Sequence, residues 1–364
     1  MALTQVETSG LSGSGASSNS TTGNVFSQTG PFKNRIINGD MRIDQRNAGA
    51  SVSTASGNNA YTLDRFQIYY AQTSKFTVQQ NAGSVTPPAG FSNYLGITSS
   101  SAYSSIAADY FFVRQHVEGY NIADLAWGTA NASAVTLSFW VRSSLTGTFA
   151  GVLRNSAENL SYVFTYSISS ANTWTAIKVN IAGPTTGTWL TTNGIGVEVH
   201  WDIGSGSNGK TGTTGSWQSG GFFSATGATS VVGTNGATFY ITGVQLEAGS
   251  VATPFERRSY GQELALCQRY YTYFGGKAGV NLIFQGYSGS SSFPTTNQLV
   301  FPSRMRTSPT ITREGTWTAS NVSTLDFGYV NEMNVSVGAV TSSVGNFFIF
   351  ADSADDKITA SAEL

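Results

Sequence analysis

The chain has a single cysteine, Cys267, and only two histidines, His116 and His200, among its 364 residues. One cysteine excludes an intrachain disulfide, and with it the small secreted domains that disulfides hold together. The three residues also do not form a cluster with the ligand spacing of a zinc site. We therefore expect a protein that is stabilised by its core and assembled in a reducing compartment.

Charged residues are scarce as well. Asp, Glu, Lys and Arg make up 11% of the chain, against about 25% in an ordinary globular protein. The formal net charge of −1 gives no electrostatic reason to expect nucleic acid or an anionic membrane as a partner. No run of 18 apolar residues is present, and the start MALTQVETSG lacks the basic and apolar parts of a signal peptide. We expect a soluble chain with no nucleic-acid partner and no membrane insertion.

Glycine and aromatic residues are plentiful instead, with 41 Gly, 22 Phe, 16 Tyr and 7 Trp. Aromatic side chains fit a pleated sheet, and glycine supplies the positive φ that many tight turns need. From Asn34 onward, short alternating runs are separated by turns rich in Gly or Asn, for example TLDRFQIYYA, AVTLSFWVRSS and GIGVEVHWDIG. This pattern predicts an all-β fold, an antiparallel sandwich or barrel.

Residues 8–30 are almost wholly small and polar. Such a segment cannot bury enough apolar surface to offset its chain entropy, so it should not fold alone. One interpretation is a flexible linker, and the other is an arm that becomes ordered by lying on a neighbouring protein. We expect an extended low-complexity arm over residues 1–33.

Several segments resemble a known family of virion proteins. They are NGDM at 38–41, TLDRF at 62–66, LSFWVR at 137–142 and, above all, FYITGVQLEAGSVATPFERRSYGQELALCQRYY at 239–271. These segments resemble the tail-fibre and tail proteins of tailed bacteriophages that carry a carbohydrate-binding-module-like jelly roll. FPSRMRTSPTIT at 301–312 and the terminal ITASAEL are similar to the C-terminal modules of such fibres.

The resemblance implies an antiparallel jelly-roll β-sandwich and a smaller C-terminal β-module, joined by a short helix. It divides the chain into the arm of residues 1–33, a jelly roll over 34–258, a neck helix over 259–273 and a distal β-module over 274–364.

Modules of this type often hold a structural calcium ion between the first strand and the last. Asn38, Asp40 and Glu247 are the candidate ligands, but Thr242 and Gly243 stand where further acidic residues would be expected. Calcium takes six to eight oxygen ligands, so the alternative is that Asp40 and Glu247 cap turns. We expect no other cofactor.

Strand alternation selects the best candidate for a sugar groove in the jelly roll. A neutral glycan needs an aromatic platform and converging polar groups. The polar faces of three predicted strands carry such groups, namely Trp140, Arg142, Arg114, His116, Glu198, His200 and Asp202. If these strands share one sheet, the side chains meet on one face. The alternatives are an ordinary solvated face with weak ion pairs and a face covered by a neighbouring subunit.

No motif selects a catalytic site. A glycosidase needs two carboxylates at a set separation, and no pattern singles out a pair among the 20 acidic residues. The chain has no G-x-S-x-G elbow and no internal repeat of the depolymerase kind. The G-x-G-x-x-G match at 204–209 is not followed by a helical pattern, so we interpret it as a loop at the tip of the sandwich. We expect a protein that is not an enzyme.

The resemblance implies a structural virion protein of a tailed phage, located on the tail or another external appendage and made in the host cytoplasm. It would attach to host-surface glycan without catalysis. The alternatives are a polysaccharide depolymerase tailspike and a purely structural decoration or adaptor protein. The arm would contact other virion proteins. The distal β-module, with the candidate contacts Tyr287 and Phe293, is favoured over the jelly roll for meeting the host.

The segment YGQELALCQRYY predicts a short helix with one narrow apolar stripe, made by Tyr260, Leu264, Cys267 and Tyr271. So short a helix does not persist alone in water, and therefore something must cover the stripe. The stripe predicts a seam near the three-fold axis of a homotrimer. The alternative is packing against the foot of its own sandwich. In either case Cys267 would be a small buried hydrophobe.

Overall fold

The structure is a computed structural model that describes residues 32–54, 57–277, 282–290 and 294–364. The predicted arm lies outside the described residues except for Phe32 and Lys33, and so does the candidate contact Phe293. In the described part of the chain, no helix has the length and hydropathy that crossing a bilayer demands.

The first large sheet has six strands in the order β1-β4-β5-β15-β7-β10. Its strands are β1 (Val52–Ser53), β4 (Phe76–Gln80), β5 (Leu95–Ser99), β7 (Val135–Ser143), β10 (Thr175–Ile181) and β15 (Thr238–Ala248). Every neighbouring pair in this six-stranded sheet is antiparallel.

The second large sheet has seven strands in the order β13-β9-β8-β11-β6-β3-β2 and is also antiparallel throughout. Its strands are β2 (Asn59–Tyr61), β3 (Gln67–Tyr70), β6 (Phe111–Glu118), β8 (Gly147–Arg154), β9 (Leu160–Ile168), β11 (Ile195–Asp202) and β13 (Trp217–Ser219). The connections carry a parallel pair, β12 (Lys210–Thr211) with β14 (Ser224–Ala225), and the short 3-10 helices η2 (Ala82–Ser84), η3 (Gly119–Asn121), η4 (Ala123–Leu125) and η5 (Ser207–Gly209).

The main hydrophobic core lies between these two sheets. Alternate residues of each strand point into it, because successive side chains of a strand face opposite sides of the sheet. The inward residues include Leu137, Phe139 and Val141 from one sheet and Val199 and Trp201 from the other. The Phe139 and Trp201 rings meet edge to face at a centroid separation of 5.7 Å. The same alternation therefore determines which residues of these strands lie on the outer face of each sheet.

Beyond the sandwich, the described residues form one α-helix, α1 (Tyr260–Gln268), and a smaller β-module. Ser259 and Gln262 form a capping box that starts α1. Three three-stranded sheets follow, β16-β24-β19, β17-β23-β20 and β18-β22-β21. Their strands are β16 (Tyr271–Gly275), β17 (Leu282–Ser288), β18 (Pro294–Val300), β19 (Thr310–Glu314), β20 (Thr318–Ser320), β21 (Val322–Val330), β22 (Asn334–Thr341), β23 (Gly345–Ala351) and β24 (Lys357–Ser361).

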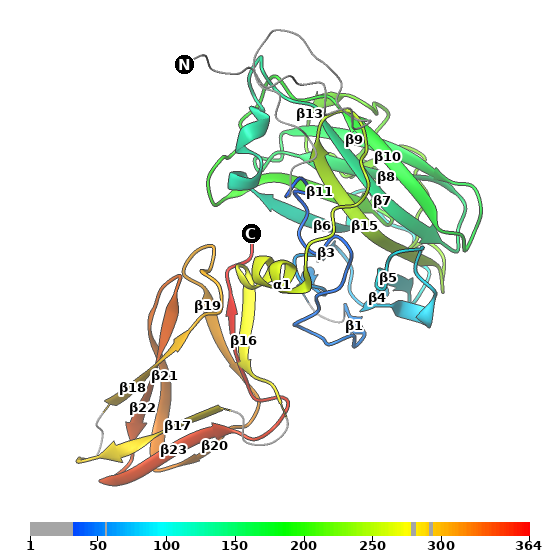
Figure 1. Cartoon of the computed structure of the whole chain (residues 1–364). Coiled ribbons are helices and arrows are strands. Elements are labelled where there is room, and N and C mark those ends of the chain that lie inside the picture. The colour runs from blue at the N-terminus through cyan, green and yellow to red at the C-terminus, as the bar shows by residue number, and fades with distance from the viewer. Residues whose placement is uncertain (1–31, 55–56, 278–281, 291–293) are drawn as a thin grey trace, which may run out of the picture.

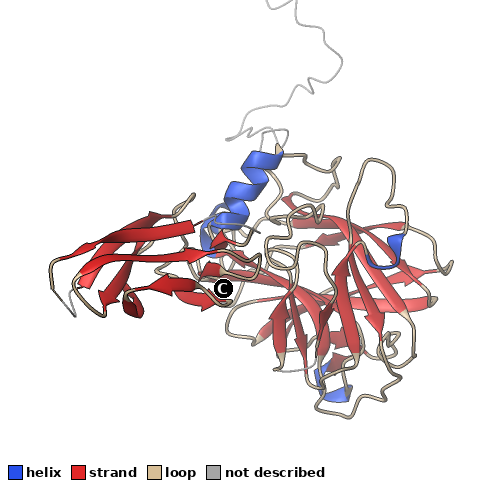
Figure 2. Ribbon diagram, turned by 90° about the horizontal axis from the view of Figure 1, so that it is seen from below, coloured by secondary structure: helices blue, strands red, loops and turns tan. Residues whose placement is uncertain are grey.

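Figures 1 and 2 show the large sandwich and the smaller β-module as separate groups of strands with α1 at their junction. The predicted fold class, an antiparallel jelly-roll sandwich followed by a short helix and a smaller β-module, is confirmed. The exact division of the chain into independently folding domains stays a prediction.

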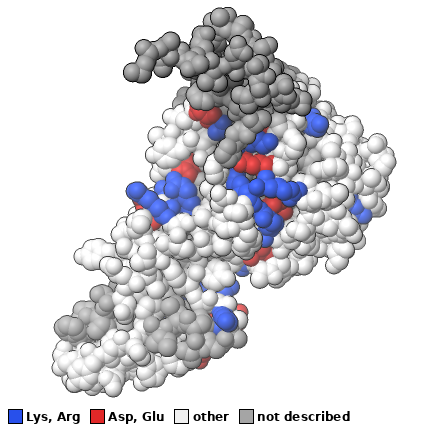
Figure 3. All heavy atoms as spheres, viewed as in Figure 1, with Lys and Arg blue, Asp and Glu red and all other residues white. Residues whose placement is uncertain are grey.

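Ion pairs connect the β-module and the end of α1 to the sandwich. Glu363 pairs with Arg65 and, at 2.7 Å, with Arg46. Arg269 lies 2.6 Å from Glu118 on β6. On the face that Figure 3 shows, many of the visible Lys, Arg, Asp and Glu side chains lie near this junction. Because Arg65 and Glu118 are buried, the two parts are held by specific contacts rather than by the connecting segment alone.

The predicted seam residues do not form one free stripe. Cys267 is fully buried in a cluster with Ile37, Ile43 and Tyr270 of the same chain. Burial raises the pKa of the Cys267 thiol well above its ordinary value, as expected for a residue that only packs. Tyr271 starts β16, beyond the helix, and its ring lies 3.7 Å from the guanidinium carbon of Arg46.

Cys267 and Tyr271 therefore match the alternative prediction, in which the helix packs against the sandwich of its own chain. Leu264 is partly buried beside the same cluster, and Tyr260 is exposed. An association of α1 with a second copy of the chain would have to use these remaining residues, and the homotrimer stays a prediction.

Candidate functional site

The structure separates the predicted sugar-groove residues into two groups. Trp140 and Arg142 lie on β7, in the six-stranded sheet, whereas the others lie on β6 and β11, in the seven-stranded sheet. On β6 and β11 they face one another in register, with Glu198 opposite His116 and His200 opposite Arg114. The prediction of one joint constellation is therefore wrong, because the outer faces of two packed sheets point in opposite directions.

The group on the seven-stranded sheet is buried and paired within the protein. The Glu198 carboxylate lies 2.7 Å from Arg154 Nη2 and 2.9 Å from His200 Nε2. The Asp202 carboxylate accepts hydrogen bonds from the Ser205 backbone N–H and the Ser224 hydroxyl, both at 2.8 Å.

Other parts of the chain cover this face. The Phe223 ring packs on Phe112 at 5.2 Å, and the Arg154 guanidinium lies over Phe223. The backbone oxygen of Leu364 lies 3.0 Å from His116 Nδ1. His116, Glu198 and His200 are each no more than 5% exposed. A polysaccharide chain therefore has no access to these groups in this conformation.

The charges of this cluster follow from its burial. Burial lowers the pKa of His116 and of His200 to about 3, so both imidazoles are neutral near pH 7. Burial alone would raise the pKa of Glu198, but the hydrogen bond from His200 and the positive charge of Arg154 hold it below its usual range. The cluster is thus one carboxylate between the buried Arg154 and, at 4.0 Å, the partly buried Arg114.

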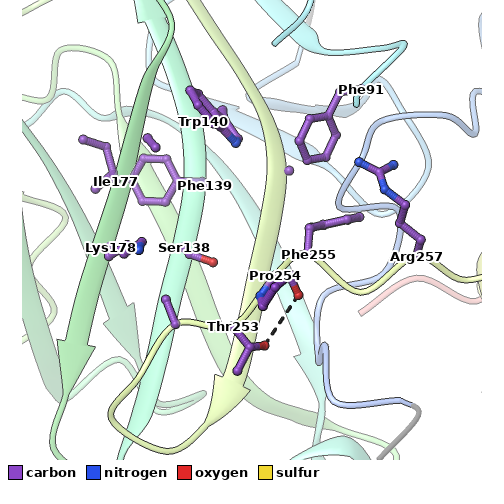
Figure 4. A pocket seen from close by; sticks show the side chains of 13 residues that line it. Phe91, Ser138, Phe139, Trp140, Ile177, Lys178, Thr253, Pro254, Phe255 and Arg257 are labelled. Carbon is purple, nitrogen blue, oxygen red and sulfur yellow. Dashed lines mark hydrogen bonds between the residues drawn. The ribbon is translucent and has the colours of Figure 1, made fainter. Parts of the chain in front are cut away.

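An open groove lies on the opposite side of the molecule, on the outer face of the six-stranded sheet. Ser138 and Trp140 of β7 form part of its floor, in register with Lys178 and Ala176 of β10. The groove has a volume of about 630 Å³. Figure 4 shows Trp140, Phe91, Phe255 and the cationic side chains around this space. Of the predicted sugar-binding residues, Trp140 alone lines it.

Outward-facing side chains of β15 hold one wall of the groove, the segment 252–257. The two carboxylate oxygens of Glu247 accept hydrogen bonds from the Thr253 backbone N–H at 2.8 Å and from its hydroxyl at 2.6 Å. The Gln245 side-chain oxygen accepts one from the Glu256 backbone N–H at 2.7 Å. These bonds fix Pro254, Phe255 and Arg257 beside the floor.

A bulge in β15 brings the aromatic side chains together. The register of β15 against β7 shifts between Thr242 and Gln245, and Gly243 has a φ of 62°. A Cβ atom at Gly243 would lie 2.6 Å from Phe91 Cζ and 3.1 Å from Trp140 Cδ1. Thr242 donates its hydroxyl to the Asn93 carbonyl at 2.7 Å, which anchors the segment that carries Phe91. Only glycine satisfies both the backbone angle and this close approach.

The groove combines apolar and cationic surface. The Phe91 and Phe255 rings meet edge to face at 5.2 Å, and the Arg257 guanidinium carbon lies 4.7 Å from the Phe91 centroid. Lys178 supplies a second cation and Ser138 a hydroxyl. Arg142, two residues beyond Trp140, donates to the Asn172 carbonyl and lies over Tyr240, so it adjoins the groove without lining it.

The candidate calcium ligands do not fit a calcium ion. The Asn38 amide donates to the carbonyls of Ile43 and Asp64, and its oxygen accepts the Ile43 N–H. Asp40 pairs with Arg42 at 2.5 Å, and Glu247 holds Thr253. Within the described ranges, no three His, Cys, Asp or Glu side chains are grouped as metal ligands. The alternative, that Glu247 caps a turn, matches its bonds to Thr253.

The remaining candidate features have other roles or stay untested. Tyr287 on β17 is exposed, at 66% of its surface, and Phe293 lies outside the described residues. In the G-x-G-x-x-G loop, the backbone N–H groups of Gly204 and Ser205 donate to Asp202, and that of Gly206 donates to Asp109. Because these donors are used inside the protein, the loop is not a phosphate cradle.

No protein-family model matches the chain, and no curated protein matches its sequence. Similar solved structures include the enzymatically active domain of tailspike protein 4 of bacteriophage CBA120, at 13% identity and a TM-score of 0.32, covering 60% of this chain and 22% of that one. A carbohydrate-binding module, CBM4, matches at 12% identity and a TM-score of 0.32, covering 58% of this chain and 98% of that one.

The family 11 carbohydrate-binding module of a cellulosomal cellulase of Clostridium thermocellum matches at 10% identity and a TM-score of 0.27, covering 55% of this chain and 95% of that one. At TM-scores this low the likenesses carry no argument about function, so the site stands on the geometry of the described residues.

Proposed function

We propose that this chain is a non-catalytic, glycan-binding protein of a tailed-phage virion. The observation that carries the proposal is the open groove with Trp140 on its floor and Phe91 and Phe255 beside it. Sugar rings present apolar faces that pack on aromatic rings, while their hydroxyls need nearby polar groups. Ser138 and Lys178 supply such groups next to Trp140.

The composition of the groove supports binding without catalysis. A glycosidase uses a pair of carboxylates on either side of the scissile bond. Among the described residues that line the groove, there is no Asp or Glu. The alternative of a depolymerase tailspike would therefore need a different site, and the alternative of a decoration or adaptor protein would leave the groove unused.

The virion assignment is supported by the resemblance of residues 239–271 to phage tail proteins. In this proposal the protein is made in the host cytoplasm and placed on the tail or another external appendage. The N-terminal arm contacts other virion proteins, and the chain forms a homotrimer. Light scattering of the full chain tests the trimer, since a monomer at working concentration would remove that part of the proposal.

Affinity electrophoresis in a panel of bacterial capsular and O-antigen polysaccharides tests the central part. We expect at least one polysaccharide to retard the full chain without being shortened. Trp140→Ala should weaken this retention about ten-fold or more, the equivalent of about 1.4 kcal/mol. Tyr287→Ala, a matched change of an exposed aromatic residue in the distal β-module, should leave it unchanged.

Each other outcome excludes part of the proposal. Loss of retention in Tyr287→Ala but not in Trp140→Ala moves glycan binding to the distal β-module. Shortening of the polysaccharide supports the depolymerase. If no polysaccharide of the panel retards the chain and none is shortened, the result supports a purely structural protein.

A further inference from the structure

Two cationic side chains flank the aromatic part of the groove. Lys178 projects from the edge strand β10 next to Ser138, and Arg257 comes from the wall segment 252–257. Figure 4 shows them on opposite sides of Trp140, Phe91 and Phe255. Both are exposed at the surface of the protein. A ligand that lies along the aromatic side chains therefore passes between two positive charges.

Neither cation has a carboxylate partner among the described residues. Ion pairs occupy many of the other arginines, for instance Arg65 with Glu363 and Arg269 with Glu118. Arg257 instead lies over the Phe91 and Phe255 rings, at 4.7 and 5.6 Å. Stacking fixes the plane of a guanidinium and leaves its N–H groups at the edge free to donate.

The carboxylates closest in sequence to the wall are already committed. Glu247 accepts hydrogen bonds from Thr253 and Gln245. Glu256 accepts the backbone N–H groups of Phe32 and Asn34. The buried Asp40 carboxylate, on which the charge of Arg257 acts, pairs with Arg42 at 2.5 Å. The positive charge of the groove is therefore not cancelled locally, although the whole chain carries a formal charge of −1.

A neutral glycan would use the aromatic surface but would displace water from both cations without replacing their counter-ions. An anionic group would form charge-assisted hydrogen bonds with them, which are about twice as strong as neutral ones. Arg257 can donate two parallel bonds to a carboxylate or phosphate, and Lys178 acts as a point charge.

We propose that the groove binds an acidic glycan, whose carboxylate or phosphate groups pair with Arg257 and Lys178 while a sugar ring packs on Trp140. This inference rests on the glycan binding proposed above and names its ligand class. It predicts a ligand selected by charge in a protein whose composition alone gives no electrostatic preference.

The experiment compares polysaccharides that share a backbone and differ in charge. The probes are polygalacturonate and its methyl ester, alginate and its propylene glycol ester, and hyaluronan and its methyl ester, with poly(glycerol phosphate) as the phosphate probe. Binding to the full chain is measured by affinity electrophoresis and titration calorimetry at low and high salt. We expect an acidic probe to bind about ten-fold more tightly than its ester, and high salt to reduce this difference.

Variants that remove single charges test whether Lys178 and Arg257 cause the preference for acidic probes. Lys178→Gln and Arg257→Gln should each weaken binding of the acidic probe about ten-fold and reduce its salt dependence. Arg257→Lys, which keeps the charge, should lose less. Lys210→Gln removes the same charge from β12, outside the groove, and should have no effect. Trp140→Ala should weaken binding of acidic and neutral probes alike.

Every outcome decides the question. If the esters bind as tightly as the acids and Trp140→Ala weakens the binding of both, the acidic preference is overturned and glycan binding stands. The acidic preference of the groove is also overturned if Lys178→Gln and Arg257→Gln leave binding of the acidic probe unchanged. It is overturned as well if Lys210→Gln weakens binding of the retained bacterial polysaccharide as much as the groove variants do. If neither these probes nor the bacterial panel are bound, glycan binding itself is refuted and the inference falls with it.

Discussion

The two outer faces of the sandwich carry similar residue types and use them in opposite ways. On the seven-stranded sheet, Glu198, His200 and Arg154 are buried beneath Phe223 and bonded to one another. On the six-stranded sheet, Lys178 and Arg257 remain exposed beside Trp140 in an open groove. The same alternation of strand residues therefore produces a sealed ionic cluster on one side and an accessible cationic groove on the other.

The difference comes from the segments that cross each face. Long connections and the last residues of the chain cover the seven-stranded sheet, so its charges lose water and must pair with each other. The segment 252–257 crosses only part of the six-stranded sheet and is held at the side by Gln245 and Glu247. Polar residues on a strand are thus not evidence of a binding face until the segments above them are known.

Removing the negative charge of Glu198 from the buried cluster should have the largest effect on the stability of the protein. Glu198→Gln leaves Arg154 and Arg114 without their shared carboxylate, which should lower the free energy of unfolding by about 3–5 kcal/mol. Glu158→Gln is the matched control, because Glu158 pairs with the same Arg154 from an exposed position, and its effect should be about 0.5 kcal/mol or less. Urea denaturation measures both. Equal small losses would show that this face is solvated like an ordinary surface.

The second prediction concerns pH. Burial lowers the pKa of His200 to about 3, against an ordinary value of about 6.5 in the unfolded chain. Between these values only the unfolded state binds the proton, so the contribution of His200 to stability is present above pH 6.5 and is lost as the pH falls towards 3.

A glutamine at this position does not titrate. The stability advantage of the natural chain over His200→Gln should therefore shrink on acidification, by about 1.4 kcal/mol for each pH unit within that window. Asp64, whose pKa burial raises to about 7, has the opposite dependence but is present in both proteins and cancels. Denaturation at a series of pH values tests this, and a constant difference would mean that His200 is accessible to water.

The smallest change in stability should come from the groove. Gly243→Ala forces a Cβ atom into a left-handed backbone position and against Phe91, which should cost about 1–2 kcal/mol and weaken retention by polysaccharide. Gly261→Ala is the control, because its Cβ would meet open space in α1 and alanine favours a helix. Full retention in Gly243→Ala would show that the close approach of Phe91 and Trp140 is not required.

The sequence predicted the fold class because strand alternation and turn residues are local signals. The inward faces of β7 and β11, with Phe139 and Trp201, follow from a period of two and are seen in the core. It also identified Trp140 as an outward aromatic residue. The assignment of strands to sheets has no local signal, and this is why Trp140 was grouped with His116 and Glu198 on one surface.

Residues that complete the groove came from segments without strand periodicity. Phe91 lies in the connection between η2 and β5, and Phe255 and Arg257 lie between β15 and α1. Their positions depend on a hydrogen bond that the Thr242 hydroxyl donates and on bonds that the Gln245 and Glu247 side chains accept, which no spacing rule predicts. The glycine in YITGVQ was the available signal, because a glycine inside a strand marks a bulge or a close approach.

Hydrogen exchange, measured by mass spectrometry with and without the polysaccharide that the retention assay selects, tests the central claim most directly. The account predicts slower exchange in residues 88–93 and 252–257, which border the groove, and no change in residues 112–118 and 198–202 of the covered face. Protection confined to the covered face, or to residues 284–288 around Tyr287, would contradict it.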